Sequence, residues 1–338
     1  MKSATPAYLP IMLIFLTACP YGYKYNIGTL PTTPVNLEEF NSEYDDYNST
    51  SGMLGGRLAF CFSTNRNSNG ERFDIIQQHM SIAYSQKTGE LTIFNNSAWT
   101  TDPNYDFFRD GLLQINTPGN DLGPYLIHNP LVNYGNYYAP YEYEYLLMYA
   151  TDEQGNFDIQ YSYNVPDSSF IDTKPVPILN SSFNDLYPTL NKDYSQIFFC
   201  SDRERSNFDI YSVTIDTTEI GITGVLENNP AGEVVFNNIL SSPYDDKCPF
   251  IMGNIMVFAS NRPGGYGGYD LYYSLWADGQ WGIPVNYGEN INTVNDEYRP
   301  ILIEEGVSST QTMMVFSSDR PGGMGGFDLY YVGINYTP

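Results

Sequence analysis

The strongest constraint on the fold is a stretch that this chain of 338 residues repeats. The C-terminal copy, Ser317 to Tyr331, reads SSDRPGGMGGFDLYY, and Ala259 to Tyr273 reads ASNRPGGYGGYDLYY. Each copy follows an apolar run, turns through polar or Gly-rich residues and ends in an aromatic-Asp-aliphatic run, which is the pattern of a β-hairpin. Weaker copies occupy residues 62–77, 150–162 and 200–212. Five hairpins of one kind predict a repeat architecture.

A second motif lies before most of the apolar runs, where two polar or acidic positions are followed by two spacers and a proline, as in Asp296-Glu297-Tyr-Arg-Pro300. Proline favours the first residue of a strand and Asn or Asp favours turns, so this motif predicts a loop that opens an extended segment. The chain ends after the third strand of its last repeat, and Pro34 to Leu37 matches the missing fourth strand. The sequence therefore predicts an all-β fold, a single β-propeller over residues 34–338 with five four-stranded blades closed by the N-terminal strand. Six blades would result if the hairpin over residues 81–94 formed a blade of its own.

The first 33 residues have the composition of a targeting segment and a tether. Residues 1–18 contain one Lys and a short apolar core, which is typical of a removable signal peptide. Leu16-Thr17-Ala18-Cys19 resembles the lipobox of bacterial lipoproteins, which implies that Cys19 becomes the lipidated first residue. The alternative is an ordinary signal peptide with an unmodified Cys. Residues 19–33 would be the tether, and the absence of an acidic cluster after Cys19 favours the periplasmic side of an outer membrane.

Composition narrows the classes of partner. Asp and Glu number 39 against 15 Lys and Arg, giving a net charge of −24. Phosphate backbones require a cationic surface, so nucleic acid is excluded as a partner. The acidity favours basic partners or cations, or serves solubility alone. His79 and His128 stand outside any spacing typical of zinc ligands, and Cys61 and Cys200 lie in apolar runs that predict buried free thiols.

The acidic pairs are one candidate binding surface. If each proline opens the innermost strand of a blade, the acids before it form an acidic rim around one mouth of the central channel. Such a rim could bind a basic peptide, a loop of an envelope protein or a calcium ion. The alternative is that these carboxylates cap the turns between blades. The predicted rim consists of Asp45, Asp46, Asp121, Asp185, Asp245, Asp246, Asp296 and Glu297.

A Tyr-rich insertion in the second repeat is the other candidate surface. Residues 134–145 contain six tyrosines, of which Tyr137, Tyr138, Tyr141 and Tyr143 are the expected contact residues. Tyrosine presents rigid, amphipathic area that suits protein and carbohydrate partners. The alternative is a loop that folds over the edge of its own blade.

The repeated Ser-Asp/Asn-Arg-x-Gly-Gly-x-Gly-Gly-aromatic-Asp-Leu-Tyr string resembles the WD-like propeller repeats of the TolB type, found in envelope proteins of the Bacteroidetes. The second repeat departs from it, with Thr151-Asp152-Glu153 and no Arg. The resemblance implies the propeller fold, an envelope location and a binding task. It covers roughly residues 34–333, without the N-terminal domain of periplasmic TolB or an OmpA-like tail.

An enzymatic function of this kind would require two carboxylates that lie outside the repeat. Glycoside hydrolysis needs an acid and a nucleophile or base in one unsymmetrical set. Every acid that the sequence singles out belongs to the repeat, so we expect no enzyme, no cofactor and no catalytic residue. The predicted function is an outer-membrane lipoprotein whose propeller binds an envelope protein. The alternative is a carbohydrate-binding protein or a glycoside hydrolase on a five-bladed propeller, with a glycan as partner.

Overall fold

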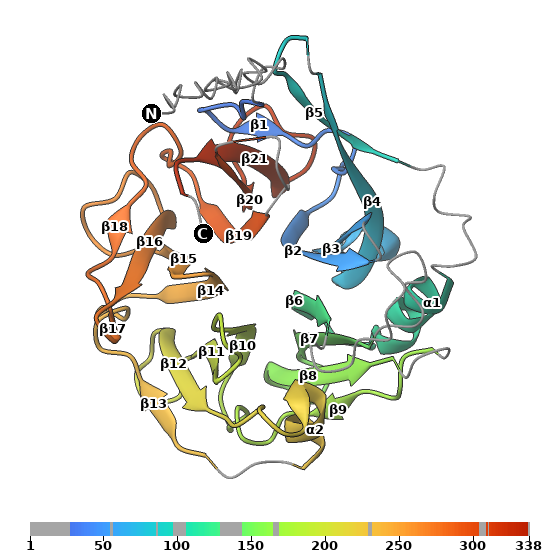
Figure 1. Cartoon of the computed structure of the whole chain (residues 1–338), viewed down its shortest axis with the longest axis vertical. Coiled ribbons are helices and arrows are strands. Elements are labelled where there is room, and N and C mark those ends of the chain that lie inside the picture. Colours follow the sequence, from blue (N-terminus) through green and yellow to red (C-terminus); the bar gives the residue numbers. More distant parts are fainter. Residues whose placement is uncertain are drawn as a thin grey trace, which may run out of the picture.

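The computed structural model confirms a single β-propeller of five blades arranged as a ring (Figure 1). Five antiparallel sheets surround a central axis, and one loop connects each blade to the inner strand of the next. The structure describes residues 28–54, 57–85, 87–96, 106–128, 144–164, 169–228, 232–303, 309 and 311–336.

The strands run outward from the axis in chain order within each blade. Blade one contains β2 (Asp46–Leu54), β3 (Arg57–Thr64), β4 (Asp74–Tyr84) and β5 (Leu91–Asn95). Blade two contains β6 (Asp121–His128), β7 (Tyr145–Thr151), β8 (Asp158–Tyr163) and β9 (Lys174–Pro175). Blade three contains β10 (Asp185–Leu190), β11 (Gln196–Ser201), β12 (Asp209–Thr214) and β13 (Val234–Phe236). Blade four contains β14 (Asp246–Met252), β15 (Ile255–Ser260), β16 (Asp270–Ala277), β17 (Gln280–Trp281) and β18 (Val285–Asn286).

Blade five joins the two ends of the chain. It contains β19 (Glu297–Ile303), β20 (Thr312–Ser318), β21 (Asp328–Ile334) and, as its outer strand, β1 (Val35–Asn36). Val35 pairs with Tyr331 and Asn36 with Tyr330. The predicted closure by the N-terminal strand is thus confirmed, and it covers an edge that an open sheet would expose.

Blade one resolves the question of a sixth blade. Its β4 continues through residues 81–84 and pairs with β5, so the hairpin belongs to blade one. Between β5 and β6 the chain forms α1 (Asp106–Ile115), a helix that the sequence analysis did not predict. A second helix, α2 (Gly221–Glu227), lies between β12 and β13 of blade three. Both helices lie at the outside of the ring (Figure 1).

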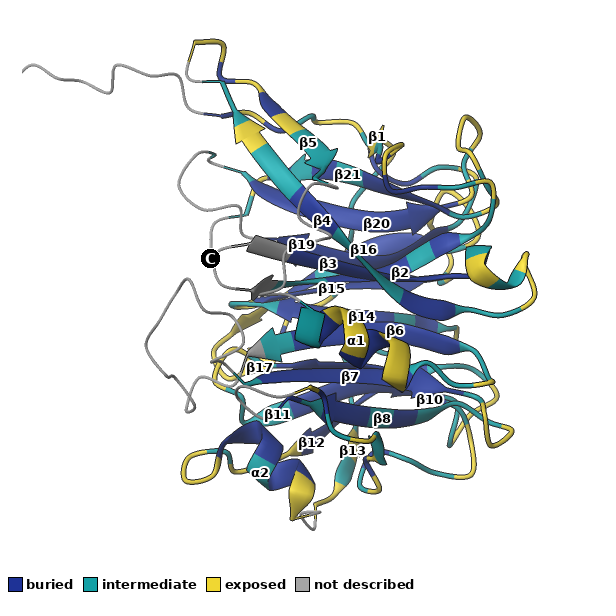
Figure 2. Cartoon of the chain, turned by 90° about the vertical axis from the view of Figure 1, so that its right-hand side faces the viewer, coloured by how far each residue is buried: buried dark blue, intermediate teal, exposed yellow. Residues whose placement is uncertain are grey.

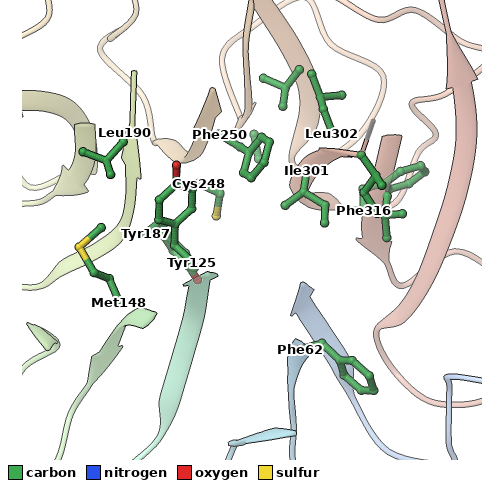
Figure 3. Packing of buried hydrophobic residues seen from close by; sticks show 14 of the residues in the cluster. Phe62, Tyr125, Met148, Tyr187, Leu190, Cys248, Phe250, Ile301, Leu302 and Phe316 are labelled. Carbon is green, nitrogen blue, oxygen red and sulfur yellow. The ribbon is translucent and has the colours of Figure 1, made fainter. Parts of the chain in front are cut away.

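Burial follows the strands, while exposed residues gather in the connecting loops and on the outer helices (Figure 2). The apolar runs of the repeats supply the core, as in β20, where every residue is buried. Residues from the inner strands of different blades meet near the axis, among them Tyr125, Tyr187, Phe250 and Ile301 (Figure 3). Cys61, Cys200 and Cys248 are buried and free, as predicted for the first two.

Candidate functional site

The predicted acidic pairs connect neighbouring blades through their backbone and side chains. Asp45 Oδ1 accepts a hydrogen bond from the Phe327 N–H at 2.8 Å, and the Asp46 N–H donates to the Phe327 carbonyl at 2.8 Å. The same double contact joins Asp245-Asp246 to Phe208 of the preceding blade. It recurs at every blade boundary, with Asn120 and Asn184 as the acceptors for the N–H groups of Phe73 and Phe157, and Asp296 as the acceptor for that of Tyr269. The pairs therefore hold the ring together, which is the turn-capping alternative.

The second acid of each pair is completely shielded from solvent. Asp46, Asp121, Asp185, Asp246 and Glu297 are all 0% exposed. Each accepts hydrogen bonds from the residue four positions earlier, as Ser181 donates to Asp185 through its N–H at 2.6 Å and its hydroxyl at 2.8 Å. In four blades an Arg of the Gly-rich or polar turn completes the contact, in the pairs Arg66–Asp46, Arg203–Asp185, Arg262–Asp246 and Arg320–Glu297.

Blade two lacks that arginine, and its acid behaves differently. Asp121 accepts hydrogen bonds from the Thr117 N–H and hydroxyl, and burial raises its pKa to about 6. A carboxyl group with a pKa near 6 suits general acid chemistry. The Asp121 side chain, however, has no exposed surface on which to meet a substrate. Among the second acids of the five pairs, Asp121 is thus the one without an arginine partner, and it is shielded from solvent.

The first acids of the pairs retain some exposure. Asp45, Asp245 and Asp296 are half-buried at the loops between blades, and the Tyr269 hydroxyl donates to Asp245 at 2.5 Å. A binding role for these three side chains stays a prediction. So does calcium at the acidic rim. Among the residues that the structure describes, no group of three or more His, Cys, Asp and Glu side chains is arranged to hold a metal ion.

Two pockets lie on either side of blade four, and no sequence pattern pointed to them. The first, which we name the Trp pocket, has a volume of about 310 Å³ and lies between blades three and four. Its aromatic wall is Trp276, 39% exposed, which packs edge-on against the buried Trp281 at 5.3 Å between ring centroids. Its polar wall consists of Asn191, Lys192, Asp193, Ser195, Gln196 and Asn254.

The second cavity, the Tyr pocket, lies between blades four and five and has a volume of about 500 Å³. Tyr273, Tyr287 and Tyr336 line it together with the amide side chains of Asn286, Asn290 and Gln311. Tyr336 links the two pockets, because its hydroxyl donates to Asn254 Oδ1 of the Trp pocket at 2.6 Å. Leu275 and Trp276 are consecutive residues of β16 that face one pocket each.

Unsatisfied polar groups occur at both pockets. The indole N–H of Trp281 and the hydroxyl of Tyr287 are buried and have no hydrogen-bond partner. Both atoms are shielded from the pockets, so neither is a contact for a ligand. The aromatic walls and the amide side chains that line the two pockets make them a candidate ligand site beside blade four.

Several predicted residues lie outside the described part of the chain. These are Cys19 and the tyrosines of the insertion, Tyr137, Tyr138, Tyr141 and Tyr143. Within the described ranges, no helix has the length and apolar character to cross a membrane.

Comparison with solved structures places the fold beside enzymes that act on glycosides. A thermostable family-43 glycoside hydrolase aligns with a TM-score of 0.53 at 12% identity, over 90% of this chain and 94% of that chain. An exo-β-1,3-galactanase from Clostridium thermocellum aligns with a TM-score of 0.50 at 10% identity, over 90% of this chain and 63% of that chain. The likeness shows the fold. No protein-family model matches the sequence, and the search of curated proteins finds no match.

These comparisons overturn two predictions from the sequence. The non-catalytic, protein-binding scaffold and the expectation of no enzyme were both inferred from the uniformity of the repeated acids and from the TolB-type resemblance. The solved structures that share the propeller are instead described as glycoside hydrolases, which favours the carbohydrate alternative. The prediction examined only the repeat motifs, whereas the Trp pocket and most of the Tyr pocket are built from residues outside them.

Proposed function

We propose that this protein acts on carbohydrate, and that a glycan chain binds along the edge of blade four. The observation that carries the proposal is the pair of pockets, each of which combines an aromatic wall with amide side chains. Sugars have apolar faces that pack on aromatic rings and hydroxyl groups that hydrogen-bond to amides and carboxylates. A largely apolar cavity with a few converging polar groups is the usual form of a small-molecule site.

The arrangement suits a chain of at least two sugar units. Trp276 faces one pocket and Tyr273 the other, and the Tyr336–Asn254 contact lies between them. The glycoside hydrolases that share the fold support carbohydrate as the substrate class. The sugar type and the linkage are left to the binding experiment.

The test is a panel of soluble and insoluble polysaccharides, scored for retention of the protein and for release of reducing ends. Binding of at least one polysaccharide is expected, and Trp276→Ala is expected to weaken it by about tenfold or more, because aromatic anchors dominate such contacts. Ile283→Ala is the matched control, since Ile283 is 85% exposed and belongs to neither pocket. Release of reducing ends would identify the protein as a hydrolase. If every polysaccharide gave neither retention of the protein nor release of reducing ends, the proposal would be rejected. Equal binding by the two variants would place the site elsewhere.

We also propose that Cys19 carries a lipid anchor in the outer membrane and that the repeats are of the TolB type. The support is the Leu16-Thr17-Ala18-Cys19 tetrapeptide and the repeated string at residues 259–273 and 317–331. Acyl chains would then hold the protein at the membrane without a spanning helix. In detergent phase partitioning, the protein should enter the detergent phase and Cys19→Ala should remain in the aqueous phase. Aqueous partitioning of both would reject the anchor.

A further inference from the structure

One buried arginine crosses the propeller axis. Each inner strand has a bulge at its third residue, where the backbone is left-handed, and these positions are Asn48, Gly123, Tyr187, Cys248 and Arg299. Arg299 belongs to blade five, yet its guanidinium donates to the Pro124 carbonyl of blade two at 3.1 Å and to the Pro249 carbonyl of blade four at 3.3 Å. It also lies over the Tyr187 ring of blade three, 5.3 Å from the centroid. A side chain that reaches three other blades must cross the axis.

The charge of this guanidinium has no counter-charge. Arg299 is 0% exposed, and no carboxylate in the described part of the chain forms an ion pair with it. Its titratable neighbours are thiols and phenols, and burial raises the pKa of Cys248 to about 11 and that of Tyr125 to about 12. The pKa values of Cys200 and Tyr187 are also raised by burial. All four groups are therefore neutral at pH 7, and an isolated buried charge is strongly unfavourable unless it is paired.

Two polar groups near the axis lack hydrogen-bond partners. One is Nε of Arg299, and the other is the side-chain amide of Asn48, which is also 0% exposed. Asn48 occupies the bulge of blade one, at the position that corresponds to Arg299 in blade five. Tyr187 and Cys248, which occupy the same position in blades three and four, lie at the centre of the ring (Figure 3).

We propose that the propeller holds, near its axis, a small monovalent anion with the charge and size of chloride, bound between Nε of Arg299 and Nδ2 of Asn48. A single negative charge balances the guanidinium, and the two unpaired N–H donors supply its contacts. The carbonyl oxygens of Pro124 and Pro249 accept from the two terminal nitrogens of the guanidinium, which leaves Nε as the donor for the anion. This ion would connect blades one and five, the two blades that the terminal strand closes.

The direct test is a crystal grown in sodium bromide, in which anomalous scattering locates the halide. A bromide peak within contact distance of Arg299 Nε and Asn48 Nδ2 is expected. A water-sized peak without anomalous signal at that position would overturn the proposal.

A solution test uses thermal unfolding in sodium chloride and in sodium gluconate at equal ionic strength. Because an anion that binds only the folded state stabilises it, the melting temperature should be higher in chloride by roughly 2–4 °C once chloride exceeds its Kd tenfold. Arg299→Met should abolish the difference between the two salts. Arg203→Met is the matched control, since Arg203 pairs with Asp185 and its loss should leave the difference intact. Equal melting temperatures of the wild type in the two salts would contradict a chloride site, even if Arg299→Met does not fold.

Discussion

Blades two and three show two ways of completing the same contact. In blade three, Arg203 pairs with Asp185 at 2.6 Å, donates to the Leu179 carbonyl and lies over the rings of Phe199 and Tyr211. The Arg203 N–H donates to the Ser201 hydroxyl at 3.2 Å. In the other blade the corresponding residue is Glu153, whose N–H donates to the Thr151 hydroxyl at 3.4 Å. The turn is thus the same, but the cation is absent.

Blade two replaces the missing donor with a tyrosine. The strand position that holds Phe199 in blade three holds Tyr149, whose hydroxyl donates to the Ile115 carbonyl at 2.9 Å. Ile115 precedes Asp121 by six residues, as Leu179 precedes Asp185. Tyrosine therefore supplies the hydrogen bond that arginine makes elsewhere, but it supplies no positive charge. The comparison shows that one role of the arginine can be replaced and the other cannot, so that Asp121 remains a buried acid with a raised pKa.

The largest expected effect is the difference in the free energy of unfolding when the charge of Asp185 or that of Asp121 is removed. Asp185→Asn leaves the Arg203 guanidinium, 13% exposed, without its carboxylate, which should lower the free energy of unfolding by about 3–5 kcal/mol. Asp121→Asn removes a charge that has hydrogen bonds but no counter-charge, and it should cost less than about 1 kcal/mol at pH 7. Urea unfolding of both variants measures the difference. Similar losses for the two would mean that the arginine contributes no more than a hydrogen bond.

The unpaired charge of Asp121 should also make the stability of the protein depend on pH. Burial raises the pKa of Asp121 from 3.8 to about 6, so the folded state retains a proton that the unfolded state has lost between these values. Stability therefore falls as the pH rises from 4 to 6, by roughly 3 kcal/mol for this group, and is constant above. Because other carboxylates titrate in the same range, the quantity to measure is the wild-type curve minus the Asp121→Asn curve. A flat difference would contradict the raised pKa.

The sequence was sufficient for the fold because each blade must make the same contacts. Hairpin strings, the proline that follows four of the five polar or acidic pairs and the matching N-terminal strand predicted five blades and their closure. The same repetition was misleading about function, since the acids that recur are the ones that join the blades. The Trp pocket combines Trp276 of blade four with Asn191 of the β10–β11 turn in blade three, and only the packing of blades brings them together. The exchange of Tyr149 and Glu153 could have been found by aligning the repeats residue by residue.

A smaller effect is expected when the tyrosine loses its hydroxyl. Tyr149→Phe leaves the Ile115 carbonyl without this donor in a buried region, which should lower the free energy of unfolding by about 1–3 kcal/mol. The control is Tyr161→Phe, which removes the hydroxyl of another buried tyrosine of the same blade without creating a large cavity. The Tyr161 hydroxyl takes no part in the turn at Glu153, so this control should lose less free energy of unfolding than Tyr149→Phe. A Tyr149→Phe variant as stable as the wild type would remove the proposed exchange of donors.

The smallest effect, and the sharpest test of the comparison, is the coupling between Tyr149 and Glu153. Glu153→Arg alone would bring a guanidinium toward a carbonyl that the Tyr149 hydroxyl already occupies. The double variant Tyr149→Phe and Glu153→Arg recreates the residues of blade three, so the arginine should pair with Asp121, lower its pKa and restore the contact to Ile115. A double-mutant cycle should therefore give a favourable coupling of about 1 kcal/mol, and the pH-dependent difference attributed to Asp121 should disappear. Additive effects of the two substitutions would show that blade two departs from the repeat by more than these side chains, since its backbone would then be unable to seat the arginine.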